Sequence, residues 1–142
     1  MTRVNVGRIT LGGAAAAAVL YLVAWAVNGG LLCDDWKSWM NATSTINHFP
    51  GQLAALVLWA IECIVLGFTG VWIYAGIRPR YGKGPRTAVL AGLLLWLAGW
   101  ASAALDRTAL GSIPAKIIVV DLAGGLVAAL LAVLIGAWIY KE

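Results

Sequence analysis

The chain has 142 residues, of which 62% are hydrophobic and 11% are charged, and its mean hydropathy is +0.88. Soluble domains average about 45–50% apolar and about 25% charged residues, so this composition excludes an ordinary soluble domain. The net charge of +4 does not indicate nucleic-acid binding, because the basic residues lie at the ends of apolar runs and form no stripe among aromatic residues.

Four apolar segments are each long enough to cross a bilayer as a helix, which takes about 20 residues. We place these spans at Ile9–Leu32, Pro50–Ile77, Thr87–Leu105 and Ile113–Tyr140. The third span leads into "LDRTALGS", which is typical of a short polar turn. The sequence therefore predicts an all-α fold, a four-transmembrane-helix antiparallel bundle, in a single domain of residues 1–142.

The first apolar segment has a second interpretation as a secretory signal peptide. Arg3 and Arg8 precede it, and "AWA" at positions 24–26 imitates an A-x-A cleavage site. A lipoprotein site is not convincing, however, because the bulky Leu32 directly precedes Cys33. We therefore expect a retained membrane span.

The distribution of lysine and arginine predicts how the spans are oriented, because short loops rich in these residues stay in the cytoplasm. Basic residues crowd the N-terminus and the loop between the second and third spans: Arg3, Arg8, Arg78, Arg80, Lys83 and Arg86. The other two loops carry fewer basic residues, mixed with aspartates: Lys37, Arg107 and Lys116. We expect a multi-pass protein of the cytoplasmic (inner) membrane with both termini in the cytoplasm. The aromatic residues expected at the membrane–water interfaces agree with this orientation. The inner interface would hold Trp72, Tyr74, Trp138 and Tyr140, and the outer interface Trp36 and Trp39.

A short motif occurs twice, as "GVWIY" at Gly70–Tyr74 and as "GAWIY" at Gly136–Tyr140. A weaker match pairs "YLVAWA" at Tyr21–Ala26 with "WLAGWA" at Trp96–Ala101. These matches predict two tandem αα-hairpin repeats, approximately residues 8–80 and 86–142, related by an axis along the membrane normal. The alternative is that interface chemistry alone places small and aromatic residues at both helix ends.

Two acidic residues, Glu62 and Asp121, lie inside apolar spans, where charged side chains are costly and usually face protein or water. Residues seven apart share nearly one helix face. The faces that contain the acids are His48, Ala55, Glu62 and Thr69 in the second span, and Pro114, Asp121, Ala128 and Ile135 in the fourth. We expect both faces to point inward, with Tyr21 and Trp96 donating hydrogen bonds to the glutamate. The candidate buried polar, ligand-binding or ion-binding residues are Glu62, Asp121, Tyr21, Trp96 and Thr69.

Small residues form stripes that let helices approach closely in lipid, where no hydrophobic force drives their association. In the first span we predict such a stripe at Gly12, Gly13, Ala16 and Ala17, and in the fourth at Asp121, Gly125, Ala128, Ala132 and Gly136.

Motifs for enzyme chemistry, zinc or phosphate binding are absent from the sequence, so we expect no catalytic residue, no cofactor and no metal. Three classes of function stay open: a protein that handles a small solute, proton or ion at the acidic site; a structural or accessory membrane subunit; and a membrane enzyme with a lipid-like substrate. The expected partners are the lipid bilayer and a second copy or a larger membrane complex, with no nucleic acid.

The chain order of helix, acidic outer loop, helix, basic loop, helix and helix is most recognisable around "WAVNGGLLCDDW" at Trp25–Trp36. It resembles the small uncharacterised four-helix integral membrane proteins of bacteria. The resemblance implies the fold and no activity.

Overall fold

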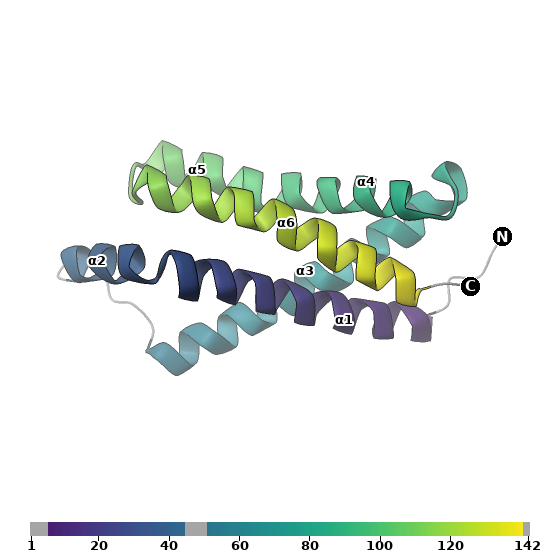
Figure 1. The fold of residues 1–142 in the computed structure, drawn as a ribbon, viewed down its shortest axis with the longest axis horizontal. Helices are drawn as coiled ribbons and strands as arrows, with labels where there is room; N and C mark the ends of the chain where they lie inside the picture. Colours follow the sequence, from purple (N-terminus) through teal and green to yellow (C-terminus); the bar gives the residue numbers. More distant parts are fainter. Residues whose placement is uncertain (1–5, 45–50, 141–142) are drawn as a thin grey trace.

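The computed structural model describes residues 6–44 and 51–140, and within them the chain is helical (Figure 1). The segments in chain order are α1 (Val6–Trp25), the π-helical η1 (Ala26–Leu31), α2 (Cys33–Thr43), α3 (Gln52–Tyr81), α4 (Pro85–Trp96), the π-helical η2 (Leu97–Ala101), α5 (Ser102–Leu110) and α6 (Ala115–Ile139).

Four continuous helical stretches are long and apolar enough to cross a membrane: Val6–Leu31, Gln52–Tyr81, Pro85–Leu110 and Ala115–Ile139. Each overlaps one of the four spans predicted from sequence, so the prediction of a four-transmembrane-helix bundle is confirmed. The protein is a multi-pass membrane protein. Pro50 and His48 lie outside the described residues.

The end of the third span was predicted wrongly. "LDRTAL" is not a turn but the last part of α5, and the turn begins at Gly111, whose φ of +61° is left-handed. The hydroxyls in this helix are satisfied by bonding back to it, so they need no water or turn: Ser102 Oγ donates to the Ala98 carbonyl at 2.5 Å, and Thr108 Oγ1 donates to the Ala104 carbonyl at 2.6 Å. The helix ends at Gly111, because glycine adopts a left-handed backbone conformation at little energetic cost.

The spans form a ring in which α1 packs against α3 and α6, and α4 packs against the same two helices. Neighbours in this ring run antiparallel. Figure 1 shows that α3 runs obliquely across the others, so that its N-terminal end lies apart from α5 and α6 while its C-terminal end lies beside α4. We call the end where α1 begins and α6 ends the termini end, and the opposite end the α2 end.

The tight core lies toward the termini end, where backbones meet at glycines. A Cβ on Gly12 would lie 2.7 Å from the Gly136 carbonyl oxygen, and one on Gly67 would lie 2.5 Å from the backbone nitrogen of Ala17. The predicted small-residue stripes are buried, apart from the half-buried Asp121: Gly12, Gly13, Ala16, Ala17, Gly125, Ala128, Ala132 and Gly136. Close approach of this kind gains van der Waals contact that lipid cannot supply.

The face assigned to α3 was predicted wrongly. Ala55, Glu62 and Thr69 are exposed, and the buried face of this helix is instead Cys63, Gly67, Gly70, Val71, Tyr74 and Ala75. The small residues decide the rotation, because only Gly67 and Gly70 allow neighbouring backbones and side chains to come so close. Glu62 directly precedes Cys63, the first residue of the buried face. Its side chain is therefore turned by about 100° around the helix axis from that of Cys63.

The two copies of the repeated motif share one pattern of burial: the glycine and the tyrosine are buried and the tryptophan is exposed. Tyr74 and Tyr140 meet edge to face, with ring centroids 6.2 Å apart, and the Arg78 guanidinium lies 5.5 Å from the Tyr140 ring centre. A common position at one membrane interface explains this similarity. A tandem repeat is not shown: the π-helical segments occur at different positions of the two odd spans, and the weaker motif match does not align them.

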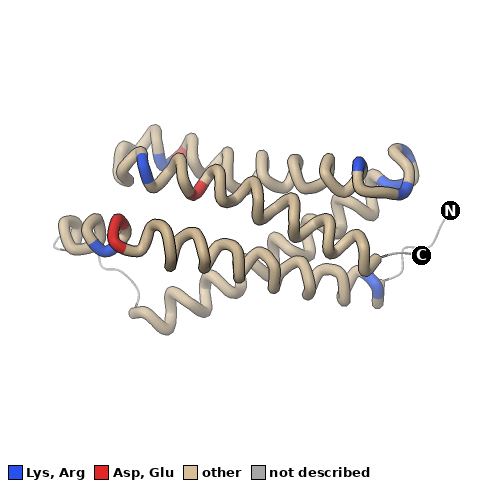
Figure 2. The backbone as a smooth tube through the Cα atoms, in the orientation of Figure 1, with Lys and Arg blue, Asp and Glu red and all other residues tan. Residues whose placement is uncertain are grey.

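Charged residues divide between the two ends of the bundle, as Figure 2 shows. The termini end carries described basic residues without acidic ones: Arg8, Arg78, Arg80, Lys83 and Arg86. The α2 end mixes both signs: Asp34, Asp35, Lys37, Asp106, Arg107, Lys116 and Asp121. The predicted asymmetry of the loops is therefore present in three dimensions.

Candidate functional site

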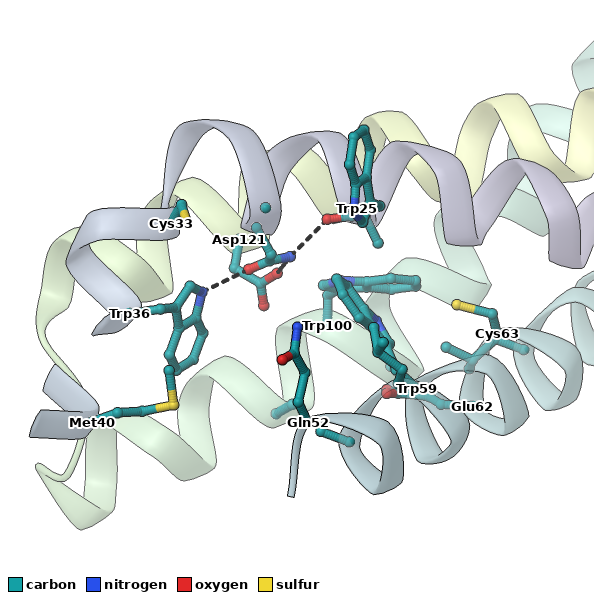
Figure 3. A pocket seen from close by; sticks show the side chains of 18 of the residues that line it. Trp25, Cys33, Trp36, Met40, Gln52, Trp59, Glu62, Cys63, Trp100 and Asp121 are labelled. Atoms are coloured by element: carbon teal, nitrogen blue, oxygen red, sulfur yellow. Dashed lines mark hydrogen bonds between the residues drawn. The ribbon is translucent and has the colours of Figure 1, made fainter. Parts of the chain in front are cut away.

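A cavity of about 610 Å³ opens in the α2 end of the bundle, where the oblique α3 leaves the other helices (Figure 3). The first eleven residues of α3, from Gln52 to Glu62, are not buried, so this part of the helix forms an outer wall and not part of the core. The chemically distinctive wall residues are Trp25, Asn28, Cys33, Trp36, Lys37, Gln52, Trp59, Glu62, Cys63, Trp100, Arg107 and Asp121.

Four tryptophans line the cavity, each from a different helical segment: Trp25, Trp36, Trp59 and Trp100. Trp100 comes from η2 and lies against Gly125 of α6, so closely that a Cβ at that position would overlap the indole ring. Val27 of η1 packs in a similar way against the neighbouring Gly124, where a Cβ would lie 2.8 Å from the Val27 side chain. Both π-helical segments thus pack on one glycine pair, and a π-helical turn of this kind is often found at functional sites.

Asp121 closes the cavity at its inner side through a network of hydrogen bonds. Arg107 Nη1 donates to Asp121 Oδ2 at 2.9 Å, and Asn28 Nδ2 donates to Asp121 Oδ1 at 3.2 Å. Trp36 Nε1 in turn donates to Asn28 Oδ1 at 2.9 Å (Figure 3). The Asp121 side chain is 15% exposed and Arg107 is 38% exposed. The Asp121 carboxylate therefore forms an ion pair with Arg107 and accepts a further hydrogen bond from Asn28. The network, with Trp36, joins α5, α6, η1 and α2.

Two further bonds hold α2 over the cavity. Lys116 Nζ bonds both carboxylate oxygens of Asp35, at 2.9 and 2.7 Å, and Trp39 Nε1 donates to the Ser112 carbonyl at 2.7 Å. Next to this contact, interaction with the Cys33 sulfur and, to a smaller extent, the charge of Asp34 raise the pKa of the exposed Lys37 above its ordinary value. The segment predicted as an acidic outer loop is thus a helix anchored to the start of α6.

Glu62 lines the cavity, but it is exposed and not shielded by neighbouring helices as predicted. Within residues 6–44 and 51–140 no hydrogen bond or ion pair involves its carboxylate. Figure 3 shows it beside Trp59, which precedes it by one helical turn on α3. It lies ten residues from the first residue of α3, roughly 15 Å along the helix axis. Glu62 is therefore an exposed acidic residue of the cavity wall.

The expected hydrogen-bond donors to Glu62 were also predicted wrongly. Trp96 Nε1 donates to the Leu122 carbonyl at 2.9 Å and joins α4 to α6. Tyr21 packs against Trp59 with ring centroids 5.8 Å apart and supports the cavity wall from behind. Neither residue lines the cavity. Thr69 is exposed, and its hydroxyl bonds back to the Val65 carbonyl at 2.7 Å, so it is not part of the site either.

Sequence reasoning missed several residues that build the site, among them Asn28, Trp59, Trp100 and Arg107. Asn28 and Arg107 could have been predicted from the sequence, because each is a polar residue near the end of a span and can form a hydrogen bond or ion pair with the acid in the fourth span. The sequence evidence for Trp100 was weaker. Adjacent glycines such as Gly124 and Gly125 in a membrane helix indicate that a bulky side chain or another helix packs closely there. The two cysteines, Cys33 and Cys63, both lie on the cavity wall (Figure 3).

No protein family model matches the sequence, and neither the curated proteins nor the solved structures include a match to this chain.

Proposed function

We propose that the protein handles a small organic solute and that the tryptophan-lined cavity is its ligand site. The observation that carries this proposal is the cavity itself, about 610 Å³ with four indoles and both membrane acids on its wall. Ligand sites are typically concave, mostly apolar, about 300–1,000 Å³ in volume, and equipped with a few polar groups. The cavity has these properties, and its apolar wall is aromatic.

The two acids take different roles in this proposal. Asp121 is engaged by Arg107 and Asn28, so it holds the closed side of the cavity in shape. Glu62 has no such engagement among the described residues and is exposed on the cavity wall, so it is the group that meets a solute. A charged side chain inside a membrane span faces protein or a water-filled cavity in most proteins, and the cavity gives Glu62 that environment.

The proposal includes an orientation. The basic termini end would lie in the cytoplasm, by the preference of short basic loops for that side, and the cavity would open in the outer half of the cytoplasmic membrane. Asp121 lies six residues from the start of α6, roughly 9 Å from the outer end of that helix. A solute would then enter from the outer surface beside α2 or sideways where the N-terminal part of α3 lies apart from α5 (Figure 1).

Binding is tested with protein that carries 5-fluorotryptophan, reconstituted in lipid nanodiscs. Three probes of similar shape are titrated: benzyltrimethylammonium, its uncharged carbon isostere neopentylbenzene, and benzylsulfonate. The fluorine resonances of Trp59 and Trp100, assigned by single Trp→Phe variants, should shift saturably with at least one probe. The resonance of the exposed Trp72, outside the cavity wall, serves as the control. The proposal fails if no probe moves the cavity resonances.

A second candidate is an accessory subunit whose partner covers α3. It is favoured by the exposure of Glu62 together with the apolar residues around it, Leu58, Ile61 and Val65. Cysteines introduced at Leu58 in a protein without Cys33 and Cys63 would then crosslink to a membrane partner or to a second copy. Crosslinking there combined with no probe binding would favour this candidate. An enzyme acting on lipid is not favoured, because Tyr21 and Trp96 lie outside the cavity wall.

A further inference from the structure

The charges on the cavity wall are unequally engaged. Arg107 is paired with Asp121 at 2.9 Å, and Lys37, on the exposed surface of α2, lies 3.7 Å from Asp34. Glu62 has no ion pair among the described residues. The cavity therefore presents one carboxylate to a ligand while its basic groups already have acidic neighbours.

The hydrogen-bond donors at the closed side of the cavity are engaged as well. The Asn28 amide donates to the Ala24 carbonyl and to Asp121, and the Trp36 indole N–H donates to Asn28. An anionic ligand needs donors directed at it, and the Asn28 and Trp36 donors at this side would have to leave existing bonds. Beside neutral donors such as the Gln52 amide, the wall offers a ligand the Glu62 carboxylate and the faces of aromatic rings, both of which attract positive charge.

Trp59 and Glu62 lie one turn apart on α3, so a ligand can contact the ring face and the carboxylate together. Trp100 approaches the same space from η2 (Figure 3), and Tyr21 packs against the ring of Trp59. Indole is the most favourable ring for a cation–π contact, and aromatic walls of this kind recognise quaternary ammonium groups. An inorganic cation would need several oxygen ligands, and the described residues hold no cluster of three acidic, histidine or cysteine side chains.

We infer that the cavity takes an organic cation with an apolar body, of the quaternary ammonium class, with Glu62 as its counter-ion and the rings of Trp59 and Trp100 as its walls. The inference rests on the proposed function and names its ligand class. A quaternary ammonium suits this site because it needs no hydrogen-bond acceptor, and its charge is spread over methyl groups that pack against indole.

The test compares benzyltrimethylammonium with neopentylbenzene, which differ by one nitrogen in place of one carbon. Affinities come from the Trp59 and Trp100 fluorine shifts, corrected for partition into nanodiscs without protein. The cation should bind about tenfold more tightly than its neutral isostere. In Glu62→Gln this preference should shrink to the part that the indole rings supply, while the affinity for neopentylbenzene stays unchanged. Glu62 is exposed, so this substitution does not disturb the core.

Two matched variants separate the site from general effects. Thr69→Val alters the same exposed side of α3 outside the cavity and should leave the cation preference intact. Trp59→Leu keeps an apolar wall but removes the ring, so it should weaken cation binding more than neutral binding. Equal affinity for the two probes in the wild-type protein overturns the inference, as does a preference for benzylsulfonate or a cation preference of undiminished size in Glu62→Gln. In each of these outcomes the proposed function still stands, whereas the absence of binding by all three probes removes both.

Discussion

The indole of Trp100 rests directly on the α-carbon of Gly125, and the space beside that glycine is fully occupied by the ring. Trp100 belongs to a π-helical segment in the third span, and Gly125 lies one helical turn after Asp121 in the fourth. This contact couples the packing of the bundle to the shape of the cavity, because the same indole forms part of the cavity wall.

Gly125→Ala is therefore expected to displace Trp100. A rigid ring cannot yield locally, so we expect a loss of about 1–3 kcal/mol in the free energy of unfolding, the usual cost of overpacking. Probe binding at Trp100 should weaken in parallel. Unfolding in mixed detergent micelles and the fluorine titration measure the two effects. Gly76→Ala, at a glycine of α3 where a Cβ meets no atom within 4 Å, is the control, and equal behaviour of the two variants would refute the assigned contact.

The Arg107–Asp121 ion pair should contribute to stability in an asymmetric way. Arg107→Met leaves a carboxylate that is only 15% exposed, whereas Asp121→Ala leaves a guanidinium that is 38% exposed and able to reach water. We expect Asp121→Ala to cost about 1–3 kcal/mol and Arg107→Met to cost more. The double variant should cost less than the sum of the two, by about 1 kcal/mol. Strict additivity in a double-mutant cycle would show that the pair is not formed.

Two glycines of α3 make a matched pair for testing the crossing with α1. A Cβ at Gly67 would lie 2.5 Å from the Ala17 backbone nitrogen and 2.9 Å from the Gly13 carbonyl oxygen, whereas a Cβ at Gly76 meets no atom within 4 Å. Gly67→Ala should push the helices apart and cost at least about 1–3 kcal/mol. Gly76→Ala should be neutral or stabilise the helix by roughly 0.5–1 kcal/mol. If Gly67→Ala were the milder change, the described crossing would be incorrect.

The proposed orientation predicts which side of the membrane reaches Cys33. This thiol is partly exposed at the start of α2, and Cys63 is buried in α3. A membrane-impermeant maleimide should label intact cells at Cys33, and Cys33→Ser should abolish that labelling while Cys63→Ser leaves it unchanged. A cysteine placed at Lys83 should react after the membrane is opened and not before. The reverse pattern would invert the orientation.

The spans and the small-residue stripes could be predicted from the sequence because both depend on local composition. A helix that crosses lipid must be apolar over its whole length, and close helix packing requires small side chains at regular spacing. The stripe in the first span, from Gly12 to Ala17, is buried as predicted. Small residues also recur in α3 around Gly67, and their spacing predicts the correct buried face of that helix, which the position of Glu62 does not.

The wall of the cavity could not be predicted, because it depends on the angle between helices and not on any one helix. Glu62 was placed in the core on the argument that a membrane acid avoids lipid, yet a cavity satisfies that requirement while the residue stays exposed. The short π-helical segments η1 and η2 leave no distinctive signal in the sequence, whereas α2 is amphipathic, with Trp36 and Met40 one turn apart on its cavity side. The segment with Arg107 resembles a turn because it is polar, and the ion pair with Asp121 depends on the extra turns of α5.

The most direct measurement of a ligand site in this cavity is a crystal structure of the protein with 4-bromobenzyltrimethylammonium. Anomalous scattering from bromine locates the probe without assumptions about its pose. The account predicts a bromine peak inside the cavity, with the ammonium group between the rings of Trp59 and Trp100 and directed at the Glu62 carboxylate. Side chains or lipid acyl chains filling that space, with bromine elsewhere or absent, would contradict it.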